Sequence, residues 1–126
     1  MKVASQPKVN QPKPRFHFQT RHYQGEAWLE FATYTDNDRV AIELWDSEGC
    51  VMRVTINYPE VSLKPGQLLI KDYSENAGIY SALALLGLIT PTEIAIPLSQ
   101  FATAKVADAT PFLRELAEEQ GVSFNA

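Results

Sequence analysis

The sequence predicts an α+β fold, in which an antiparallel β-sheet meander is packed by a central helix and followed by a short C-terminal helix. Three observations lead to this prediction. Between residues 27 and 58, apolar and polar residues alternate in three runs that short turns separate. A segment near residues 75–86 carries the start and stop signals of an α-helix, and a second helix start follows at residues 110–111. Consecutive strands with separate helices are typical of α+β proteins.

The alternating runs predict the strands of the meander. In each run every second residue is apolar, as expected for a strand with one face in the core. The connections are rich in Asp, Asn, Ser and Gly, which favour tight turns. The predicted strands are Phe16–Phe18, Ala27–Tyr34, Arg39–Asp46 and Cys50–Tyr58, with turns at residues 35–38 and 47–49. One face of this sheet is apolar and needs a cover.

The cover is predicted to be a helix over residues 75–86. Ser74 suits the N-cap, because its hydroxyl can accept a hydrogen bond from an early backbone amide. Gly87 fits the left-handed position that closes a helix, and Leu88 fits the next position, where an apolar residue packs back on the last turn. The apolar stripe has helical spacing and comprises Ile79, Leu83 and Leu86.

The remaining segments extend the sheet and add the second helix. Further strands are expected at Leu68–Ile70, Thr92–Leu98 and Phe101–Ala107. Pro97 places its strand at a sheet edge, because proline cannot donate a ladder hydrogen bond. The C-terminal helix has Thr110 as N-cap and Pro111 at its first position, and it ends at Gly121.

The composition fits one globular domain. The chain has 126 residues, of which 45% are hydrophobic, and a net charge of −4; a chain of this length can bury a self-sufficient core. Its single cysteine, Cys50, excludes an internal disulfide. No apolar run approaches the ~20 residues of a membrane helix, and the N-terminus lacks the apolar stretch of a secretory signal. We therefore expect a soluble, cytoplasmic protein that contacts no membrane.

The first residues differ from the rest of the chain. Residues 1–14 are polar and contain three prolines, so we expect a disordered basic leader before a single α+β domain at residues 15–126. Residues 1–21 carry five basic residues and no acidic one, and all fifteen acidic residues follow. Such an arm can bind DNA or an acidic partner. The acidic body argues against nucleic acid, and the preferred interpretation is a solvated leader.

The most unusual stretch, residues 72–76, connects a predicted strand to the predicted helix, and we call it the corner. Its side chains could form a recognition loop, or they could serve the structure as caps and helix-dipole charges. Gly78 costs about 1 kcal/mol relative to alanine inside a helix, so we expect it to let another backbone or a ligand come close. Carboxylates in the corner argue against a phosphate ligand. The candidate binding residues are Asp72, Tyr73, Ser74, Glu75 and Asn76.

Trp28 and Trp45 form a second candidate binding surface. The alternation places both on the sheet face opposite the apolar one. If that face is uncovered, the rings form an exposed aromatic patch of the kind that marks protein interfaces. The alternative is that the C-terminal helix, or a second copy of the chain in a homodimer, covers them.

No catalytic or metal-binding pattern stands out. A nucleophile and base would have to come from Cys50 with His17 or His22, and nothing near Cys50 in the sequence lowers its pKa. Two histidines and one cysteine match no zinc spacing. We therefore expect no metal and no cofactor. Local backbone bonding in predicted turns explains two acidic pairs, Asp36 with Asp38 and Asp46 with Glu48.

A longer pattern surrounds the corner. It runs from a strand ending in Asn and Pro, through a turn, to a Lys-Asp-Tyr-Ser-Glu-Asn stretch, a glycine, a helix and a Gly-Leu-Ile ending. The residues that form it are Asn57, Pro59, Ile70, Lys71, Asp72, Tyr73, Ser74, Glu75, Asn76, Gly78, Gly87, Leu88 and Ile89. In this pattern residues 54–89 resemble a family of small uncharacterised proteins of bacterial conjugative elements, plasmids and phages, a domain of unknown function. That family often has an acidic residue where this chain has Ala77, which leaves the Ser74 capping box incomplete.

The resemblance implies a mobile-element accessory protein and brings no activity with it. Our preferred hypothesis is a non-enzymatic protein that binds a protein partner through the corner or through Trp28 and Trp45. One such partner is a host defence complex, inhibited in the manner of an anti-restriction or anti-CRISPR protein. The alternatives are a small hydrolase-like enzyme with its site at the corner, and a DNA-associated regulator that uses the basic leader.

Overall fold

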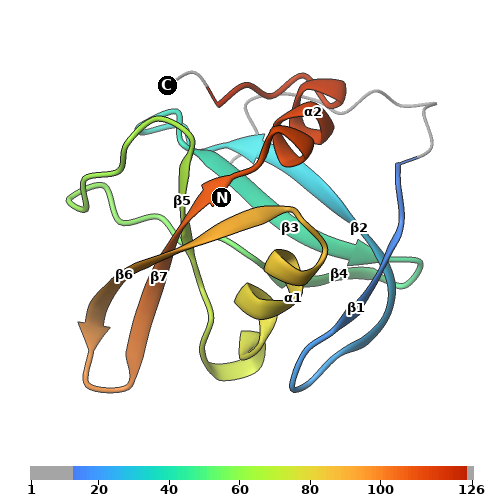
Figure 1. The fold of residues 1–126 in the computed structure, drawn as a ribbon, viewed down its shortest axis with the longest axis horizontal. Coiled ribbons are helices and arrows are strands. Elements are labelled where there is room, and N and C mark those ends of the chain that lie inside the picture. Colours follow the sequence, from blue (N-terminus) through green and yellow to red (C-terminus); the bar gives the residue numbers. More distant parts are fainter. Residues whose placement is uncertain (1–12, 125–126) are drawn as a thin grey trace.

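The structure is a computed structural model that describes residues 13–124, and it shows an α+β fold with antiparallel sheets, as the sequence predicts (Figure 1). No helix in this part of the chain is long and apolar enough to cross a membrane. In chain order the elements are β1 (Phe16–Gln19), β2 (Gln24–Thr33), β3 (Val40–Asp46), β4 (Gly49–Arg53), β5 (Gln67–Ile70), a 3-10 turn (Ser74–Asn76), α1 (Ile79–Leu85), β6 (Ile89–Ser99), β7 (Ala102–Ala109) and α2 (Pro111–Glu119).

Strands β1 to β4 form the predicted meander, with neighbours in sequence paired antiparallel. Phe31 lies opposite Ile42, and both are almost fully buried on the inner face of the sheet. Trp28 lies opposite Trp45. Because side chains alternate between faces along a strand, these two rings lie on the outer face, as expected.

Strands β5, β7 and β6 form a second antiparallel sheet, which the chain after β4 joins to the meander. The prediction that the fourth strand extends to Tyr58 is wrong, because β4 ends at Arg53. At Val54 the chain turns from β3 toward β5, where Thr55 bridges to Ile70. The segment therefore changes its pairing partner in mid-course, and the two sheets become one curled surface.

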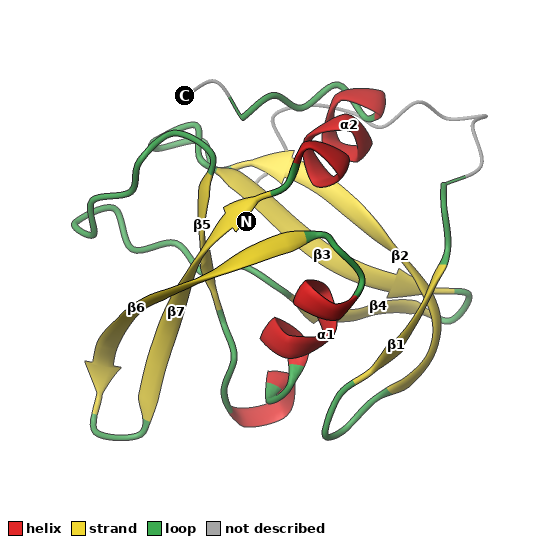
Figure 2. Cartoon of the chain, viewed as in Figure 1, coloured by secondary structure: helices red, strands yellow, loops and turns green. Residues whose placement is uncertain are grey.

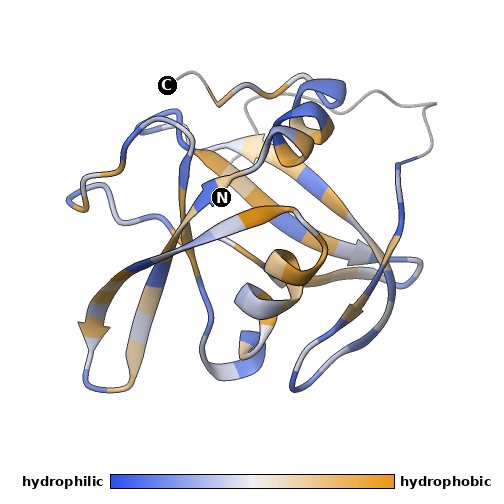
Figure 3. Cartoon of the chain, in the orientation of Figure 1, coloured by the Kyte–Doolittle hydropathy of each residue, from blue (hydrophilic) through white to orange (hydrophobic). Residues whose placement is uncertain are grey.

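Helix α1 lies between β1 and β6, the outer strands of this curled surface, and contacts both (Figure 1). Its inward side chains Ile79, Tyr80 and Leu83 are at most 8% exposed, and they share one core with residues of both sheets. The Tyr80 hydroxyl also donates to the Val106 carbonyl at 2.8 Å. Figure 3 shows hydrophobic residues concentrated in β3, α1 and the start of β6. The helix therefore covers the apolar face of the sheet, as predicted.

The C-terminal end of α1 agrees with the sequence prediction. Gly87 adopts a φ of +74°, which the absence of a Cβ makes accessible. The Leu88 amide donates to the Leu83 carbonyl at 3.0 Å, and both leucines are buried. These are the backbone and apolar contacts of a Schellman C-cap.

The predicted start of that helix at residue 75, with Ser74 as N-cap, is wrong. The chain first makes the 3-10 turn, and the N-cap of α1 is Gly78, with a φ of +99°. The capping carboxylate comes from Asp72, whose Oδ1 accepts from the Gly78 and Tyr80 amides at 2.9 and 3.2 Å. Asp72 provides two hydrogen bonds at this end, so α1 begins four residues later than predicted.

Helix α2 packs against the inner side of the meander, so it does not cover the two tryptophans. Its buried residues Leu113 and Leu116 belong to the same core as the inner face of β2 and β3, and Figure 2 shows it beside β2, apart from α1. The Thr110 hydroxyl accepts from the Leu113 amide at 3.2 Å, as expected for the N-cap. The alternative in which the C-terminal helix covers the tryptophans is therefore wrong.

The residue after α2, Gln120, completes the free edge of β2. The pairing with β1 stops at Ala27, opposite the first residue of β1, Phe16, so no residue of β1 lies beside Leu29 and Phe31. The Gln120 amide nitrogen donates to the Leu29 carbonyl at 2.7 Å, and its oxygen accepts from the Phe31 amide at 2.9 Å. One buried side chain thus takes the place of a neighbouring strand.

Candidate functional site

The corner is built largely for structure, and Asp72 is its anchor. While Oδ1 caps α1, Oδ2 of Asp72 lies 2.8 Å from Lys105 Nζ on β7. The Asp72 side chain is 9% exposed, so both of its oxygens are used inside the protein. A carboxylate held in this way positions the helix and is poorly placed to meet a ligand.

Asn76 and Gly78 also face inward. The Asn76 side chain is 1% exposed, and its amide nitrogen donates to the Arg53 carbonyl at 2.5 Å. A Cβ at Gly78 would lie 3.1 Å from the Arg21 backbone nitrogen and 3.3 Å from Thr20 Cα. Gly78 therefore lets the β1–β2 loop come close, which confirms the expectation of a neighbouring backbone at this glycine.

The outward part of the corner consists of Tyr73, Ser74 and Glu75. Lys71 Nζ donates to Glu75 Oε2 at 2.9 Å. This hydrogen bond is the main reason why the pKa of Glu75 falls from 4.5 to about 2, with help from its own backbone amide and the Ser74 hydroxyl. The same Lys71 Nζ lies 5.6 Å from the centroid of the Tyr73 ring. These contacts are local and largely exposed.

The outer face of the meander is the second candidate site, and its centre is a cross-strand pair of tryptophans. Both rings are half-buried. Trp28 Nε1 donates to Glu30 Oε2 at 2.5 Å, and Trp45 Nε1 donates to Glu43 Oε1 at 3.0 Å. Each tryptophan thus holds the glutamate two positions away on its own strand. We call Trp28, Glu30, Glu43 and Trp45 the aromatic–acidic face.

The two glutamates of the aromatic–acidic face lie directly opposite each other. Like charges in that position are destabilising, and a cation lies beside each of them. Lys13 Nζ is 2.7 Å from Glu30 Oε2, whereas Arg53 Nε is 3.6 Å from Glu43 Oε2. Arg53 is 61% exposed, so the pairing of Glu43 is the looser of the two.

Lys13 of the predicted leader and Arg15, the first residue of the predicted domain, contact this face. The Arg15 guanidinium is 4.9 Å from the centroid of the Trp28 ring, and Lys13 binds the adjacent Glu30. The expectation of a disordered leader concerns residues 1–14, of which 1–12 lie outside the described residues. Of the remaining two residues, Lys13 pairs with Glu30.

A groove of about 490 Å³ lies next to neighbours of both candidate sites. Lys71 lines it from the corner side, and Arg53, the ion-pair partner of Glu43, lines it from the meander. Tyr34 forms part of its wall, with its hydroxyl 3.0 Å from Thr55 Oγ1. Both cations of the groove already have carboxylate partners, Glu43 for Arg53 and Glu75 for Lys71. Its one carboxylate, Asp36, accepts from the Asn57 amide nitrogen at 3.0 Å.

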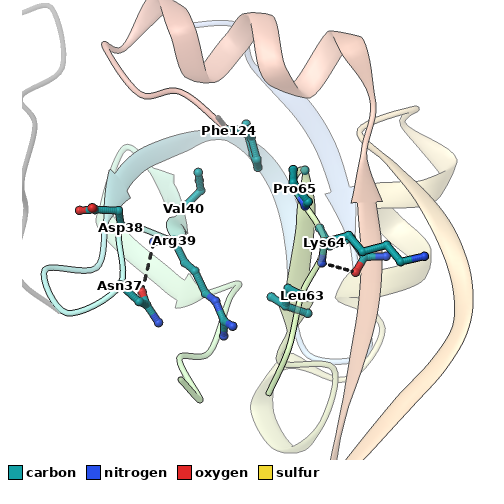
Figure 4. A pocket seen from close by; sticks show the side chains of 10 residues that line it. Asn37, Asp38, Arg39, Val40, Leu63, Lys64, Pro65 and Phe124 are labelled. Atoms are coloured by element: carbon teal, nitrogen blue, oxygen red, sulfur yellow. Dashed lines mark hydrogen bonds between the residues drawn. The ribbon is translucent and has the colours of Figure 1, made fainter. Parts of the chain in front are cut away.

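A smaller pocket of about 130 Å³ lies between residues 37–40 and residues 63–67 (Figure 4). Phe124, Leu63 and Pro65 supply its apolar wall. Arg39 reaches along the opposite side, where its guanidinium donates to the carbonyls of Tyr58 and Val61. Arg39 thus braces the loop before β5, which is a structural role.

The residues weighed for catalysis do not converge. His17 Nδ1 lies 3.3 Å from Glu26 Oε2, and within residues 13–124 neither His17 nor His22 hydrogen-bonds to a side chain of the corner. Burial and the charge of Glu43 raise the pKa of the exposed Cys50 thiol, which disfavours the reactive thiolate. In the same described range, no three histidine, cysteine or acidic side chains gather closely enough to hold a metal ion.

Comparison with known proteins shows no similarity that carries a function: no family model, no curated protein and no solved structure matches this chain.

Sequence reasoning identified the two tryptophans and missed the charged residues that complete their face. Glu30 and Glu43 each lie two positions from a tryptophan, so strand alternation alone places them on the same face. Lys13 and Arg15 gave no such signal, because they precede the first strand in a segment with the composition of a solvated leader.

Proposed function

We propose that this protein is non-enzymatic and binds a protein partner through the aromatic–acidic face. One observation carries the proposal: two half-buried tryptophans lie side by side on a sheet face that neither described helix covers. Aromatic residues enriched in a surface patch mark protein interfaces, and tryptophan is among the residues that contribute most to binding energy. The adjoining glutamates give the patch its polarity.

The corner is the less favoured contact surface. Two of its five candidate side chains, Asp72 and Asn76, are used inside the fold. Its sequence pattern is therefore accounted for by the strand-to-helix connection that it builds. For the same reason, the resemblance of residues 54–89 to the mobile-element family bears on a common fold more than on a common binding site.

The biological setting that we propose follows from that resemblance alone. The protein would be an accessory protein of a plasmid, phage or conjugative element, and its partner would be a component of a host defence system such as a restriction or CRISPR complex. Inhibition would then consist of occupying a surface of that complex. No catalytic step is required of the small protein.

The test is capture of partners by the tagged full chain from a bacterial lysate, followed by mass spectrometry. Wild type is compared with Trp45→Ala, Glu43→Lys and Tyr73→Ala, after circular dichroism has shown that each variant is folded. We expect a partner that wild type and Tyr73→Ala retain and that both variants of the aromatic–acidic face lose. A partner lost only with Tyr73→Ala would move the contact to the corner and overturn the proposal.

Salt provides a second test of the same proposal. Charges at a surface contact are screened over roughly 8 Å at physiological ionic strength and over roughly 3 Å at 1 M. If Glu30 and Glu43 contribute, retention of the partner should fall as salt rises from 0.05 to 0.5 M, mainly through slower association. Retention that is independent of salt would show that the tryptophans make the contact and that the glutamates do not contribute.

A further inference from the structure

We infer that the aromatic–acidic face accepts an extended Lys-X-Arg segment of a partner protein, and that residues 13–15 of this chain occupy the same positions as an internal competitor. The inference rests on the proposed function, because it names the chemistry of the partner at that site. The competition would also regulate binding, because residues 13–15 have to leave the face before the Lys-X-Arg segment of the partner can bind.

The geometry of residues 13–15 motivates the inference. Pro14 restricts its own φ and favours an extended conformation in the residue before it. Side chains two positions apart in an extended segment point the same way, so Lys13 and Arg15 face the sheet together. Their groups reach two different acceptors: Lys13 Nζ lies 2.7 Å from Glu30, and the Arg15 guanidinium lies 4.9 Å from the Trp28 ring centroid.

The chemistry of these two contacts selects basic side chains. The face of an indole ring carries negative electrostatic potential and attracts a guanidinium. The Glu30 carboxylate is held in place by Trp28 Nε1, so it is oriented before a cation arrives. Two glutamates on the same face repel phosphate groups. A basic protein segment therefore fits this surface, whereas a nucleic acid does not.

Half of the aromatic–acidic face is left for a longer ligand. Within residues 13–124, no lysine or arginine lies over the Trp45 ring. Among the cations of the same described range, Glu43 pairs loosely with the exposed Arg53, at 3.6 Å. The chain's own segment thus uses one tryptophan and one glutamate of two. A ligand with a further basic residue reaches the second set and displaces the internal segment.

The internal contacts are weak enough to be displaced. Lys13 and Glu30 are each about a quarter exposed. A surface ion pair and an exposed cation–π contact each change an equilibrium by about threefold. The apparent affinity for an outside ligand equals the intrinsic affinity multiplied by the fraction of molecules in which residues 13–15 have left the site. Removing both basic side chains should therefore tighten binding of an outside segment by about tenfold.

The experiment measures fluorescence anisotropy of a labelled synthetic peptide with the sequence of residues 7–16, titrated with the full chain. A matched peptide carries alanine in place of the lysine and arginine that correspond to Lys13 and Arg15. The proteins are wild type, the double variant Lys13→Ala/Arg15→Ala, and that double variant with Glu30→Gln. A Glu93→Gln change on the double variant is the control, because it removes one negative charge from the distant strand β6.

We expect the double variant to bind the peptide about tenfold more tightly than wild type does. On the double variant, Glu30→Gln should remove most of this gain and Glu93→Gln should keep it. The alanine peptide should bind neither wild type nor the double variant. Equal binding by wild type and the double variant overturns the inference. Equal losses with Glu30→Gln and Glu93→Gln also overturn it, because they would show attraction to net charge instead of to this face.

The outcome separates this inference from the proposed function. If a captured partner depends on Trp45 but the peptide neither binds nor competes with it, the inference fails and the proposed function stands. If the peptide binds through Glu30 but no partner depends on the aromatic–acidic face, the basic-segment site stands and the proposed function fails.

Discussion

Asp72 Oδ2 lies 2.8 Å from Lys105 Nζ, and this ion pair joins the end of β5 to the middle of β7. The same carboxylate caps α1 through its other oxygen. One side chain therefore connects the second sheet to the helix that fills the opening between β1 and β6. This connection explains why the corner combines polar residues with a structural role.

Replacing Asp72 should destabilise the fold markedly. Asp72→Ala leaves two backbone amides and the Lys105 ammonium without their acceptor, and each lost partner of this kind costs about 1–3 kcal/mol. We expect a loss of about 3 kcal/mol in the free energy of unfolding, measured by urea denaturation. Ser74→Ala, on an exposed neighbour in the same corner, should change stability by less than about 0.5 kcal/mol. Equal effects of the two variants would contradict the anchoring role of Asp72.

Two glycines with positive φ separate backbone strain from crowding by neighbouring atoms. Gly78 and Gly49 have φ values of +99° and +123°, but a Cβ at Gly78 meets the Arg21 backbone at 3.1 Å whereas a Cβ at Gly49 meets nothing within 4 Å. Gly49→Ala should cost about 1 kcal/mol from strain alone. Gly78→Ala should cost about 1–2 kcal/mol more, because the β1–β2 loop has to move. Thermal unfolding of both variants tests this, and equal costs would mean that the loop yields freely.

Gln120 should be more important than its place near the end of the chain indicates. Gln120→Leu removes the partners of the Leu29 carbonyl and the Phe31 amide, which are buried. An unsatisfied buried polar group costs about 1–3 kcal/mol, so we expect a loss of about 2–3 kcal/mol. Hydrogen exchange of the Phe31 amide should also quicken. Glu119→Ala, on the exposed residue before it, is the control, and an unchanged exchange rate at Phe31 in Gln120→Leu would refute the contact.

The low pKa of Glu75 predicts a small acid-dependent term in stability. The Lys71 hydrogen bond lowers the pKa from 4.5 in the unfolded chain to about 2 in the folded protein. Its stabilisation is therefore present above pH 4.5 and is lost as pH falls toward 2. Because the Glu75 side chain is 62% exposed, screening keeps the effect below about 1 kcal/mol.

Unfolding of wild type and Glu75→Gln at pH 6 and pH 2.5 measures that term. The stability difference between the two proteins should shrink at the lower pH, where Glu75 begins to lose its charge. The same pair of measurements on Glu93→Gln, which removes an exposed carboxylate elsewhere, supplies the background. A difference for Glu75→Gln that is constant with pH would show that its ion pair contributes nothing.

The parts of the fold that depend on neighbouring residues could be predicted from the sequence. The meander, its apolar face and the Gly87 end of α1 follow from alternation and local backbone chemistry. The start of α1 could not be predicted, because it is set by contacts of Asp72 with Lys105 and of Gly78 with the Arg21 backbone. The early end of β4 likewise depends on pairing with β5, which lies beyond a loop.

The candidate site shows the same division. Alternation placed Trp28 and Trp45 on one outer face, and the register confirms that they are opposite each other. Whether a helix covers that face depends on where α2 packs. Helix α2 packs on the apolar inner face, where Leu113 and Leu116 are buried in the core. The placement of Arg15 over Trp28 is a tertiary contact that no local pattern carried.

The most direct test of the aromatic–acidic face as a binding surface is nuclear magnetic resonance of the tryptophan indoles. The chain has two tryptophans, so Trp28→Phe assigns both indole N–H resonances. The residue 7–16 peptide is titrated into the Lys13→Ala/Arg15→Ala variant. We expect both indole resonances to shift and to saturate at the affinity found by anisotropy. Indole resonances that stay fixed while backbone amides of residues 72–76 move would contradict it.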